Sequence, residues 1–258
     1  MNMNAIVEVS DLSFSIGESI ILRDISFRIR PGEYISVIGP NGSGKTTLLK
    51  CLDRIYTPQK GDIRINGTTI NAYRQKALAK IMGYVPQTTG QSYPFSVYEF
   101  VLMGRYPFLN PFTPPKREDH EAVLDALRLT DMEDFTHRIM GTLSGGERQK
   151  ILIAAALAQG SEILLLDEPT TFLDPRHQDE VQEILIRINK ESEVTIIAST
   201  HDINSAISAS DRIIALKKGA IIFSGTPDEL IKNGVLKRIY DRSFVQMTHP
   251  HTHMPVVL

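Results

Sequence analysis

A glycine-rich stretch at residues 39–47 has the residue types and spacing to bind a triphosphate. It reads Gly39, Pro40, Asn41, Gly42, Ser43, Gly44, Lys45, Thr46 and Thr47. The run fits G-x-x-x-x-G-K-[ST], the P-loop, and it follows an apolar run that is typical of a buried strand. Its glycines let backbone N–H groups close around phosphate oxygens, and the helix that follows adds partial positive charge. We expect all nine residues to bind nucleotide, with Lys45 on the β- and γ-phosphates and Thr46 on Mg²⁺.

Two acids end a second apolar run and could complete a hydrolytic site. Residues 163–166 are Ile-Leu-Leu-Leu, and Asp167 and Glu168 follow them. A carboxylate at the end of a strand can hold Mg²⁺, and its neighbour can orient and polarise an attacking water. Acids often end strands without such a role, but beside a P-loop this pair is the expected second half. We assign Asp167 to Mg²⁺ and Glu168 to the general base.

A histidine ends the next apolar run. His201 follows residues 194–198, so it would lie on the same edge as Asp167 if the two strands are neighbours. A histidine there can hydrogen-bond the γ-phosphate and hold the base and the water in place. A lone histidine is usually structural, but its position at a strand end favours the catalytic interpretation.

The stretch Leu-Ser-Gly-Gly-Glu-Arg-Gln at residues 143–149 predicts a second anion site. Ser144 and Glu147 have the spacing of a capping box, and the apolar run after them continues the helix. A helix N-terminus with Ser144, Gly145 and Gly146 can bind phosphate, although it lacks the lysine of the P-loop. The alternative is a helix that is simply well capped.

The elements around these motifs predict an α/β protein. Apolar runs separated by helical spacers predict a parallel sheet covered by helices, and alternating residues before the Asn66-Gly67 turn predict antiparallel strands in the N-terminal third. Residues 118–129 show an amphipathic helical pattern within an inserted helical segment. We expect a nucleotide-binding core with its β subdomain at 1–87 and 160–235, a helical subdomain at 88–159 and a C-terminal tail at 236–258.

Composition limits the kind of partner. The chain has 258 residues with 28 basic and 30 acidic side chains, and a net charge of −2 does not suit nucleic-acid binding as the main task. The single cysteine, Cys51, is expected to be buried and to have a packing role. The N-terminus shows no targeting signal and no apolar run could span a bilayer, so we expect a cytoplasmic protein whose membrane work is done by a partner.

Taken together, these motifs resemble those of the ATP-binding cassette (ABC) ATPases, over residues 7–240. The resemblance implies a P-loop NTPase (RecA-like) core with an N-terminal antiparallel β subdomain and an inserted helical subdomain. It implies that Gln87 contacts Mg²⁺ and takes part in catalysis with Lys45, that Asp174 lies in the D-loop at the nucleotide, and that His201 is the switch histidine. It also implies a head-to-tail homodimer that holds ATP between Lys45 of one copy and Ser144, Gly145 and Gly146 of the other.

One position departs from the family pattern. An aromatic residue usually stacks on adenine early in the β region, but Ile16 stands at the equivalent place here. Apolar contact by Ile16 could replace stacking, and Phe14 is the alternative.

A finer resemblance concerns cargo. Arg176-His177-Gln178 and the stretch at 101–107 look like those of importer ATPases for iron chelates, haem and cobalamin, with molybdate and tungstate carriers as related alternatives. Such an ATPase binds a membrane permease, depends indirectly on an extracytoplasmic binding protein, and lies at the cytoplasmic face of the membrane. Non-transport ABC ATPases are disfavoured, because the insert is too short for a repair-type coiled coil and the chain has one cassette rather than two.

Three histidines near the C-terminus alternate. His249, His251 and His253 would share one face of a strand and could bind a transition metal. The alternative, which we favour, is an exposed histidine run without a ligand.

Overall fold

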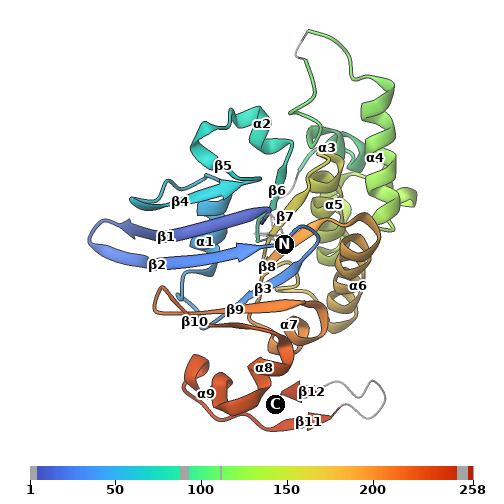
Figure 1. The fold of residues 1–258 in the computed structure, drawn as a ribbon. Helices are drawn as coiled ribbons and strands as arrows, with labels where there is room; N and C mark the ends of the chain where they lie inside the picture. The colour runs from blue at the N-terminus through green and yellow to red at the C-terminus, as the bar shows by residue number, and fades with distance from the viewer. Residues whose placement is uncertain (1–4, 88–92, 111, 249–254, 258) are drawn as a thin grey trace. The chain divides into compact units, whose positions relative to one another are not determined.

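The computed structural model describes residues 5–87, 93–110, 112–248 and 255–257. These residues pack into two compact units (Figure 1). The first unit lies within residues 1–72 and 195–258, and the second lies within residues 73–194. These boundaries differ from the expected helical subdomain at 88–159, because the strand at 82–85 and the helix at 175–192 both pack against the helix at 145–158.

An antiparallel sheet forms one layer of the first unit. Its order is β2 (Ser19–Ile29), β1 (Val7–Ile16), β4 (Lys60–Ile65) and β5 (Thr68–Thr69). The turn between β4 and β5 places Asn66 at φ 50° and Gly67 at φ 75°, which are the left-handed values that a two-residue hairpin needs. The predicted N-terminal β region and its Asn66-Gly67 hairpin are confirmed.

Parallel strands form the other layer of the first unit. The central strand β3 (Tyr34–Ile38) is buried throughout and pairs in parallel with β8 (Thr195–Ser199) on one side and β9 (Arg212–Lys217) on the other. Strand β10 (Ala220–Gly225) extends this layer antiparallel to β9. Helix α1 (Lys45–Leu52) follows β3, and α7 (Ile203–Ala209) follows β8. The segments that leave β3 and β8 therefore start from the same edge of neighbouring strands.

The C-terminal residues belong to the core of the first unit. They form α8 (Pro227–Ile231), η4 (Lys232–Gly234), α9 (Val235–Tyr240), β11 (Gln246–Thr248) and β12 (Pro255–Val257), at the red end of the colour scale in Figure 1. Ile239 and Val257 are buried in an apolar cluster with Ile203 of α7. The Asn204 side chain also pairs with the backbone of Val257 through two hydrogen bonds of 2.8 and 3.0 Å. The described residues of the segment expected as a tail, 236–248 and 255–257, thus include some that pack in the core.

The second unit combines a strand pair with helices. Its elements are α2 (Gln75–Ala79), β6 (Met82–Val85), α3 (Val97–Met103), α4 (Arg117–Leu129), η2 (Glu133–Phe135), η3 (Met140–Thr142), α5 (Gly145–Ala158), β7 (Ile163–Asp167) and α6 (Pro175–Ser192). Strands β6 and β7 are parallel. Apolar residues of α3, α4 and α5 form one buried cluster, which holds these three helices together.

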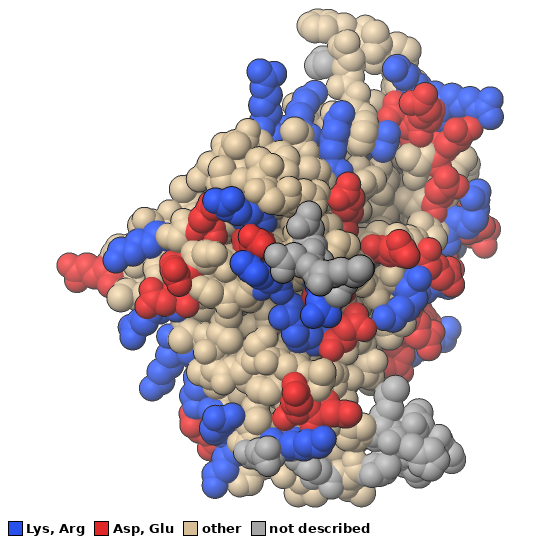
Figure 2. Space-filling model, in the orientation of Figure 1, with Lys and Arg blue, Asp and Glu red and all other residues tan. Residues whose placement is uncertain are grey.

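Charges are mixed over the surface. Figure 2 shows basic and acidic side chains interspersed on the face that it presents, in keeping with the near-neutral balance of the sequence. No helix within the described residues has both the length and the apolar character to cross a membrane. Cys51 is buried, as predicted, and burial raises the pKa of its thiol to about 12.

Candidate functional site

The P-loop leaves β3 through a backbone path that only glycine can follow. Gly39 has φ 146°, and a Cβ at this position would overlap the carbonyl oxygen of Leu216. The Lys45 ammonium donates hydrogen bonds to the carbonyl oxygens of Gly39 (3.0 Å) and Pro40 (3.5 Å), and the residue is only 5% exposed. The lysine is therefore folded back across its own loop, at the place where phosphates would bind.

The start of helix α1 has the features of an anion site. Gly44 precedes the helix at φ 105°, no side chain among the described residues caps it, and its first turn contains no acid. Ser43 is 3% exposed, and its hydroxyl oxygen has no hydrogen-bond partner within the described part of the chain. Buried polar atoms in proteins nearly always have partners. An oxygen-rich anion such as a phosphate fits this unsatisfied hydroxyl and the uncapped helix end.

His201 lies on the same edge of the first unit as the P-loop. It follows β8, and the Thr200 amide donates a hydrogen bond to the carbonyl of Val37 in β3 (3.1 Å). Its side chain is exposed, and Asp202 caps α7 by accepting hydrogen bonds from the two amides of Asn204 and Ser205. The first unit therefore places the P-loop and the predicted switch histidine at the carboxyl ends of adjacent strands.

In the second unit, the two acids after β7 have different surroundings. Asp167 is 3% exposed, and the Tyr84 hydroxyl donates to its Oδ2 at 3.3 Å. Glu168 is half-buried and adopts φ 49°, a left-handed conformation that is costly for a non-glycine residue and is often found at functional sites. Its Oε2 accepts hydrogen bonds from Gln87 Nε2 (3.2 Å) and Thr171 Oγ1 (3.0 Å).

The structure thus brings Gln87 and Glu168 together and adds two residues that sequence analysis missed. Tyr84 and Thr171 each donate to one of the paired acids. Thr171 stands three residues after Glu168, a spacing at which a hydroxyl commonly meets a turn residue, so that signal was available. Tyr84 comes from the neighbouring strand β6, and no local pattern links it to Asp167.

The second predicted anion site starts with a complete capping box. Ser144 caps α5 by accepting from the Glu147 amide (3.3 Å), while Glu147 Oε2 accepts from the Ser144 amide (2.7 Å). Burial acts to raise the pKa of Glu147, but the hydrogen bonds from the Ser144 amide and hydroxyl outweigh it and lower the pKa. The predicted capping box is confirmed, and the first turn of α5 already carries a carboxylate.

Asp174, predicted to lie at the nucleotide, has partners of its own. It caps α6, with Oδ1 accepting from the His177 amide (3.1 Å) and Oδ2 paired with His177 Nδ1 (2.6 Å). The hydrogen bond from the His177 side chain lowers the pKa of Asp174. The imidazole of His177 in turn lies against Gly146 of the anion site, so the second unit joins these two motifs.

Of the two candidates for adenine contact, one is buried and the other is exposed. Phe14 is 7% exposed and stacks on Tyr56, with ring centroids 5.1 Å apart. Ile16, at the end of β1, is 57% exposed. Ile16 is therefore the apolar side chain that remains available for a base. His249, His251 and His253 lie outside the described residues, and among those described no group of three or more His, Cys, Asp or Glu could hold a metal ion.

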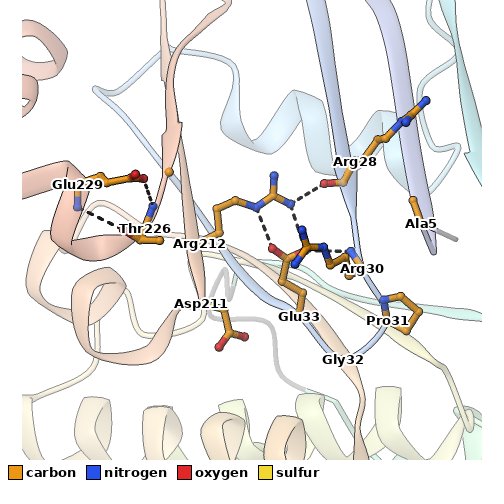
Figure 3. Close-up of a pocket in the computed structure, with 11 residues that line it drawn as sticks. Ala5, Arg28, Arg30, Pro31, Gly32, Glu33, Asp211, Arg212, Thr226 and Glu229 are labelled. Atoms are coloured by element: carbon orange, nitrogen blue, oxygen red, sulfur yellow. Dashed lines mark hydrogen bonds and ion pairs between the residues drawn. The ribbon is translucent and has the colours of Figure 1, made fainter. Parts of the chain in front are cut away.

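A pocket of about 930 Å³ in the first unit is a poor candidate for this chemistry (Figure 3). It lies at the amino ends of β3 and β9, whereas ligands of α/β sheets bind at the carboxyl ends. The guanidinium of Arg212 points to Glu33, with hydrogen bonds of 2.8 and 3.1 Å, and to the carbonyl of Arg28. Arg212 and Glu33 thus neutralise each other in this pocket.

Known proteins resemble this chain in sequence and in fold. A family model described as "ABC transporter" matches residues 22–171. The Iron(3+)-hydroxamate import ATP-binding protein FhuC of Bacillus subtilis (strain 168) is 40% identical over 256 residues, which cover 99% of this chain and 95% of the relative. A solved metal-chelate type ABC transporter in an inward-facing conformation is 29% identical, with a TM-score of 0.86 over 99% of this chain and 98% of its own.

A second similar solved structure is a dimer. A dimeric ATP-binding cassette in a post-hydrolysis state, bound to ADP and Pi, is 30% identical, with a TM-score of 0.72 over 86% of this chain and 98% of its own. Together these likenesses confirm the predicted fold class, and their high coverage shows that it extends over nearly the whole sequence.

Proposed function

This chain belongs to the ABC transporter family of ATPases, and from this premise we propose that it is the ATP-hydrolysing subunit of an importer for an iron chelate. The relative FhuC is named for iron(3+)-hydroxamate import, and a structural neighbour is of metal-chelate type. These names favour a ferric siderophore over haem, cobalamin, molybdate or tungstate as the cargo.

The observation that carries hydrolysis is the carboxylate of Glu168. Gln87 and Thr171 both donate to its Oε2, which fixes the orientation of the group expected to polarise water. A module that only binds nucleotide has no need of a carboxylate held in this way. We therefore assign Glu168 as the general base and His201 as the residue that hydrogen-bonds the γ-phosphate.

Both units contain residues that we assign to nucleotide binding. In the first unit, residues 39–47 bind the phosphates through backbone N–H groups, the Ser43 hydroxyl and Lys45, and Ile16 contacts the adenine. In the second unit, Asp167 and Gln87 offer oxygen donors for Mg²⁺, as Thr46 does in the first. Oxygen donors suit this hard cation, which when bound neutralises phosphate charge. Gln87 uses its amide nitrogen on Glu168 and can offer its oxygen to the ion.

Two copies complete the site. We propose a head-to-tail homodimer in which Ser144, Gly145 and Gly146 of one copy bind the ATP held by Lys45 of the other, with Asp174 nearby. A dimeric cassette among the structural neighbours supports this arrangement. Loss of the γ-phosphate on hydrolysis would remove the bridge between copies and let them part. The dimer would drive an integral membrane permease at the cytoplasmic face, fed by an extracytoplasmic binding protein.

The substitution Glu168→Gln tests the catalytic assignment. The amide keeps the size of the side chain but cannot act as a base, so we expect ATP turnover to fall at least about 100-fold while ATP still holds a dimer. Turnover is measured by phosphate release, and dimerisation by sedimentation with ATP and Mg²⁺. Glu183→Gln, at an exposed position on α6, serves as the matched control and should change neither. Rapid ATP cleavage by Glu168→Gln would remove Glu168 from this role.

A transport assay tests the proposed identity of the cargo. The subunit would be assembled with its permease and binding protein in vesicles, and uptake of a ferric hydroxamate would be compared with uptake of cobalamin and molybdate. ATP-dependent uptake of the ferric hydroxamate alone supports the assignment. Uptake of molybdate or cobalamin in its place would leave the ATPase role intact and refute the cargo.

A further inference from the structure

The imidazole of His177 packs directly on the backbone of α5, in its first turn. A Cβ added to Gly146 would lie 2.6 Å from Cγ and 2.8 Å from Cβ of His177, and it would overlap Cδ2. Real Cβ atoms do not approach other carbons so closely, so only glycine at position 146 allows this contact. His177 comes from the first turn of α6, 31 positions further along the chain.

A hydrogen bond fixes the other side of the ring. His177 Nδ1 lies 2.6 Å from Asp174 Oδ2, and the His177 amide donates to Asp174 Oδ1. The side chain of His177 is 29% exposed, and Leu173 lies 3.5 Å from the position of a Cβ on Gly145. The ring therefore lies between Asp174 at the start of α6 and Gly146 at the start of α5.

Two acids face this imidazole from the two helices. Asp174 belongs to the cap of α6, and Glu147 belongs to the first turn of α5, where His177 is one of the charges that lower the pKa of Glu147. Further along, Lys150 and Glu180 form a partly buried ion pair between the same helices. The Lys150–Glu180 pair thus stabilises the contact between α5 and α6 along their sides. His177 acts at the N-terminal ends of the two helices.

We propose that His177 is a positioning residue that fixes the Ser144–Gly146 anion site to the Leu173–Asp174 segment, so that one copy presents both to its partner's nucleotide as a single rigid surface. This inference rests on the proposed head-to-tail dimer. His177 acts through Gly146 and Asp174 and need not touch the nucleotide. Its loss should weaken the closing of the dimer on ATP, and it should spare binding of ATP to the P-loop of a single copy.

The test uses the full chain carrying Glu168→Gln, in which ATP is not consumed. Dimerisation is followed by sedimentation over a range of ATP concentrations, and ATP binding to the monomer is followed at protein concentrations below those that give dimers. We expect His177→Ala to raise the ATP concentration needed for half-maximal dimerisation about tenfold and to change monomer affinity less than twofold. Asp179→Ala, at an exposed position two residues along α6, is the control and should leave both values unchanged.

Two further variants separate the two contacts of the ring. His177→Phe keeps a flat ring on Gly146 but cannot bond Asp174, and His177→Asn keeps a polar group close to the position of Nδ1 but lacks the ring. We expect each to restore part of the dimerisation that His177→Ala loses. In the active protein, His177→Ala should raise KM for ATP with kcat at saturation within about twofold, a split that general unfolding would not give.

A double-mutant cycle tests the contact itself. Gly146→Ala should lower Tm strongly when His177 is present and much less beside His177→Ala, because the smaller side chain leaves room for the new methyl group. Equal losses in both backgrounds would show that the ring does not restrain Gly146 and would overturn the proposal.

Two further outcomes would decide against the role of His177. If Glu168→Gln dimerises with ATP and the added His177→Ala leaves its midpoint unchanged, His177 is not a positioning residue and the proposed function stands. If Glu168→Gln itself forms no dimer with ATP, the head-to-tail arrangement fails, and the role of His177 fails with it.

Discussion

Helices α1 and α5 are both expected to bind phosphate at their N-termini, but their ends are built in opposite ways. Helix α1 starts without a capping side chain among the described residues, has Lys45 as its first residue and ends at Leu52, with Asp53 as its C-cap. Helix α5 starts in the Ser144–Glu147 capping box, and the carbonyl of Ala158 in its last turn accepts a hydrogen bond from Arg105 (2.9 Å).

At the two ends of α5, Glu147 in the first turn and Arg105 on the Ala158 carbonyl follow the helix dipole, whereas Lys45 and Asp53 at the two ends of α1 oppose it. An acid near a helix start and a base near its end are stabilising, and the reverse arrangement costs stability. Lys50 in the last turn of α1 is the exception. A helix that opposes the rule at its start is prepared for a bound anion, which would supply the missing negative charge. The α5 site already contains a carboxylate, so we expect it to bind phosphate only when a partner copy presents it.

The substitution with the largest expected effect removes the lysine from the start of α1. Lys45→Ala should lower kcat/KM for ATP about 1000-fold, because a charged donor to the transferred phosphate is lost. ATP should also raise Tm of the wild-type chain and not that of the variant, since a ligand stabilises only a protein that binds it. Phosphate release measures the change in kcat/KM, and thermal denaturation with and without ATP measures the change in Tm.

Lys50→Ala gives the matched control on the same helix. Lys50 lies over the ring of Tyr56, at 5.5 Å from its centroid, and away from the P-loop end of the helix. Its loss should leave ATP affinity within about twofold. If Lys50→Ala lowered activity as much as Lys45→Ala, the effect would come from general destabilisation of α1.

The second prediction concerns the C-terminal end of α5. Arg105 and Asp119 form a buried ion pair at 3.0 Å, with side chains 11% and 7% exposed, and Arg105 also binds Ala158. Arg105→Ala should lower the free energy of unfolding by about 3 kcal/mol, because it leaves Asp119 buried without its cation. Chemical denaturation followed by circular dichroism measures this loss.

The neighbouring pair Arg117–Glu121 is the exposed counterpart. The Arg117 side chain is 91% exposed, so Arg117→Ala should cost less than about 1 kcal/mol. Equal losses in the two variants would show that Arg105 does not hold α5, and the contrast between the two helices would weaken.

Sequence analysis predicted the features that depend on residues close together in the chain. The Ser144–Glu147 box and the Asn66-Gly67 hairpin each depend on residues within four positions, and both are found as predicted. Their hydrogen bonds form within one turn of the chain, so residue type and spacing are enough to predict them.

Contacts between distant segments could not be predicted in the same way. The pairs Arg105–Asp119, Tyr84–Asp167 and His177–Gly146 join residues that only the tertiary fold brings together. Phe14 and Ile16 show the same limit, because alternation gives both the same face of β1. Tyr56, from another segment, stacks on Phe14 and leaves Ile16 exposed. Gln87 was expected at the nucleotide only through resemblance to a family, and its hydrogen bond to Glu168 was not predicted.

The smallest expected effect is a pH dependence at the other end of α1. Burial raises the pKa of Asp53 to about 7 from 3.8, although Arg54 acts to lower it. The folded state therefore holds this proton more tightly than the unfolded state does. Stability from this group is fully present below about pH 4 and is lost as pH rises towards 7. Above that pH, a charged carboxylate stays at the C-terminal end of the helix, where the dipole disfavours it.

Asp53→Asn should remove this pH dependence. The amide is never charged, so the variant should be about 2 kcal/mol more stable than the wild type at pH 8 and nearly equal to it at pH 4. Urea denaturation at the two pH values measures the difference, and Asp134→Asn at an exposed position should show no such trend. A stabilisation that is the same at both pH values would mean that Asp53 acts through packing. The end of α1 would then no longer count as opposed to the helix dipole, and the contrast with α5 would rest on the N-termini alone.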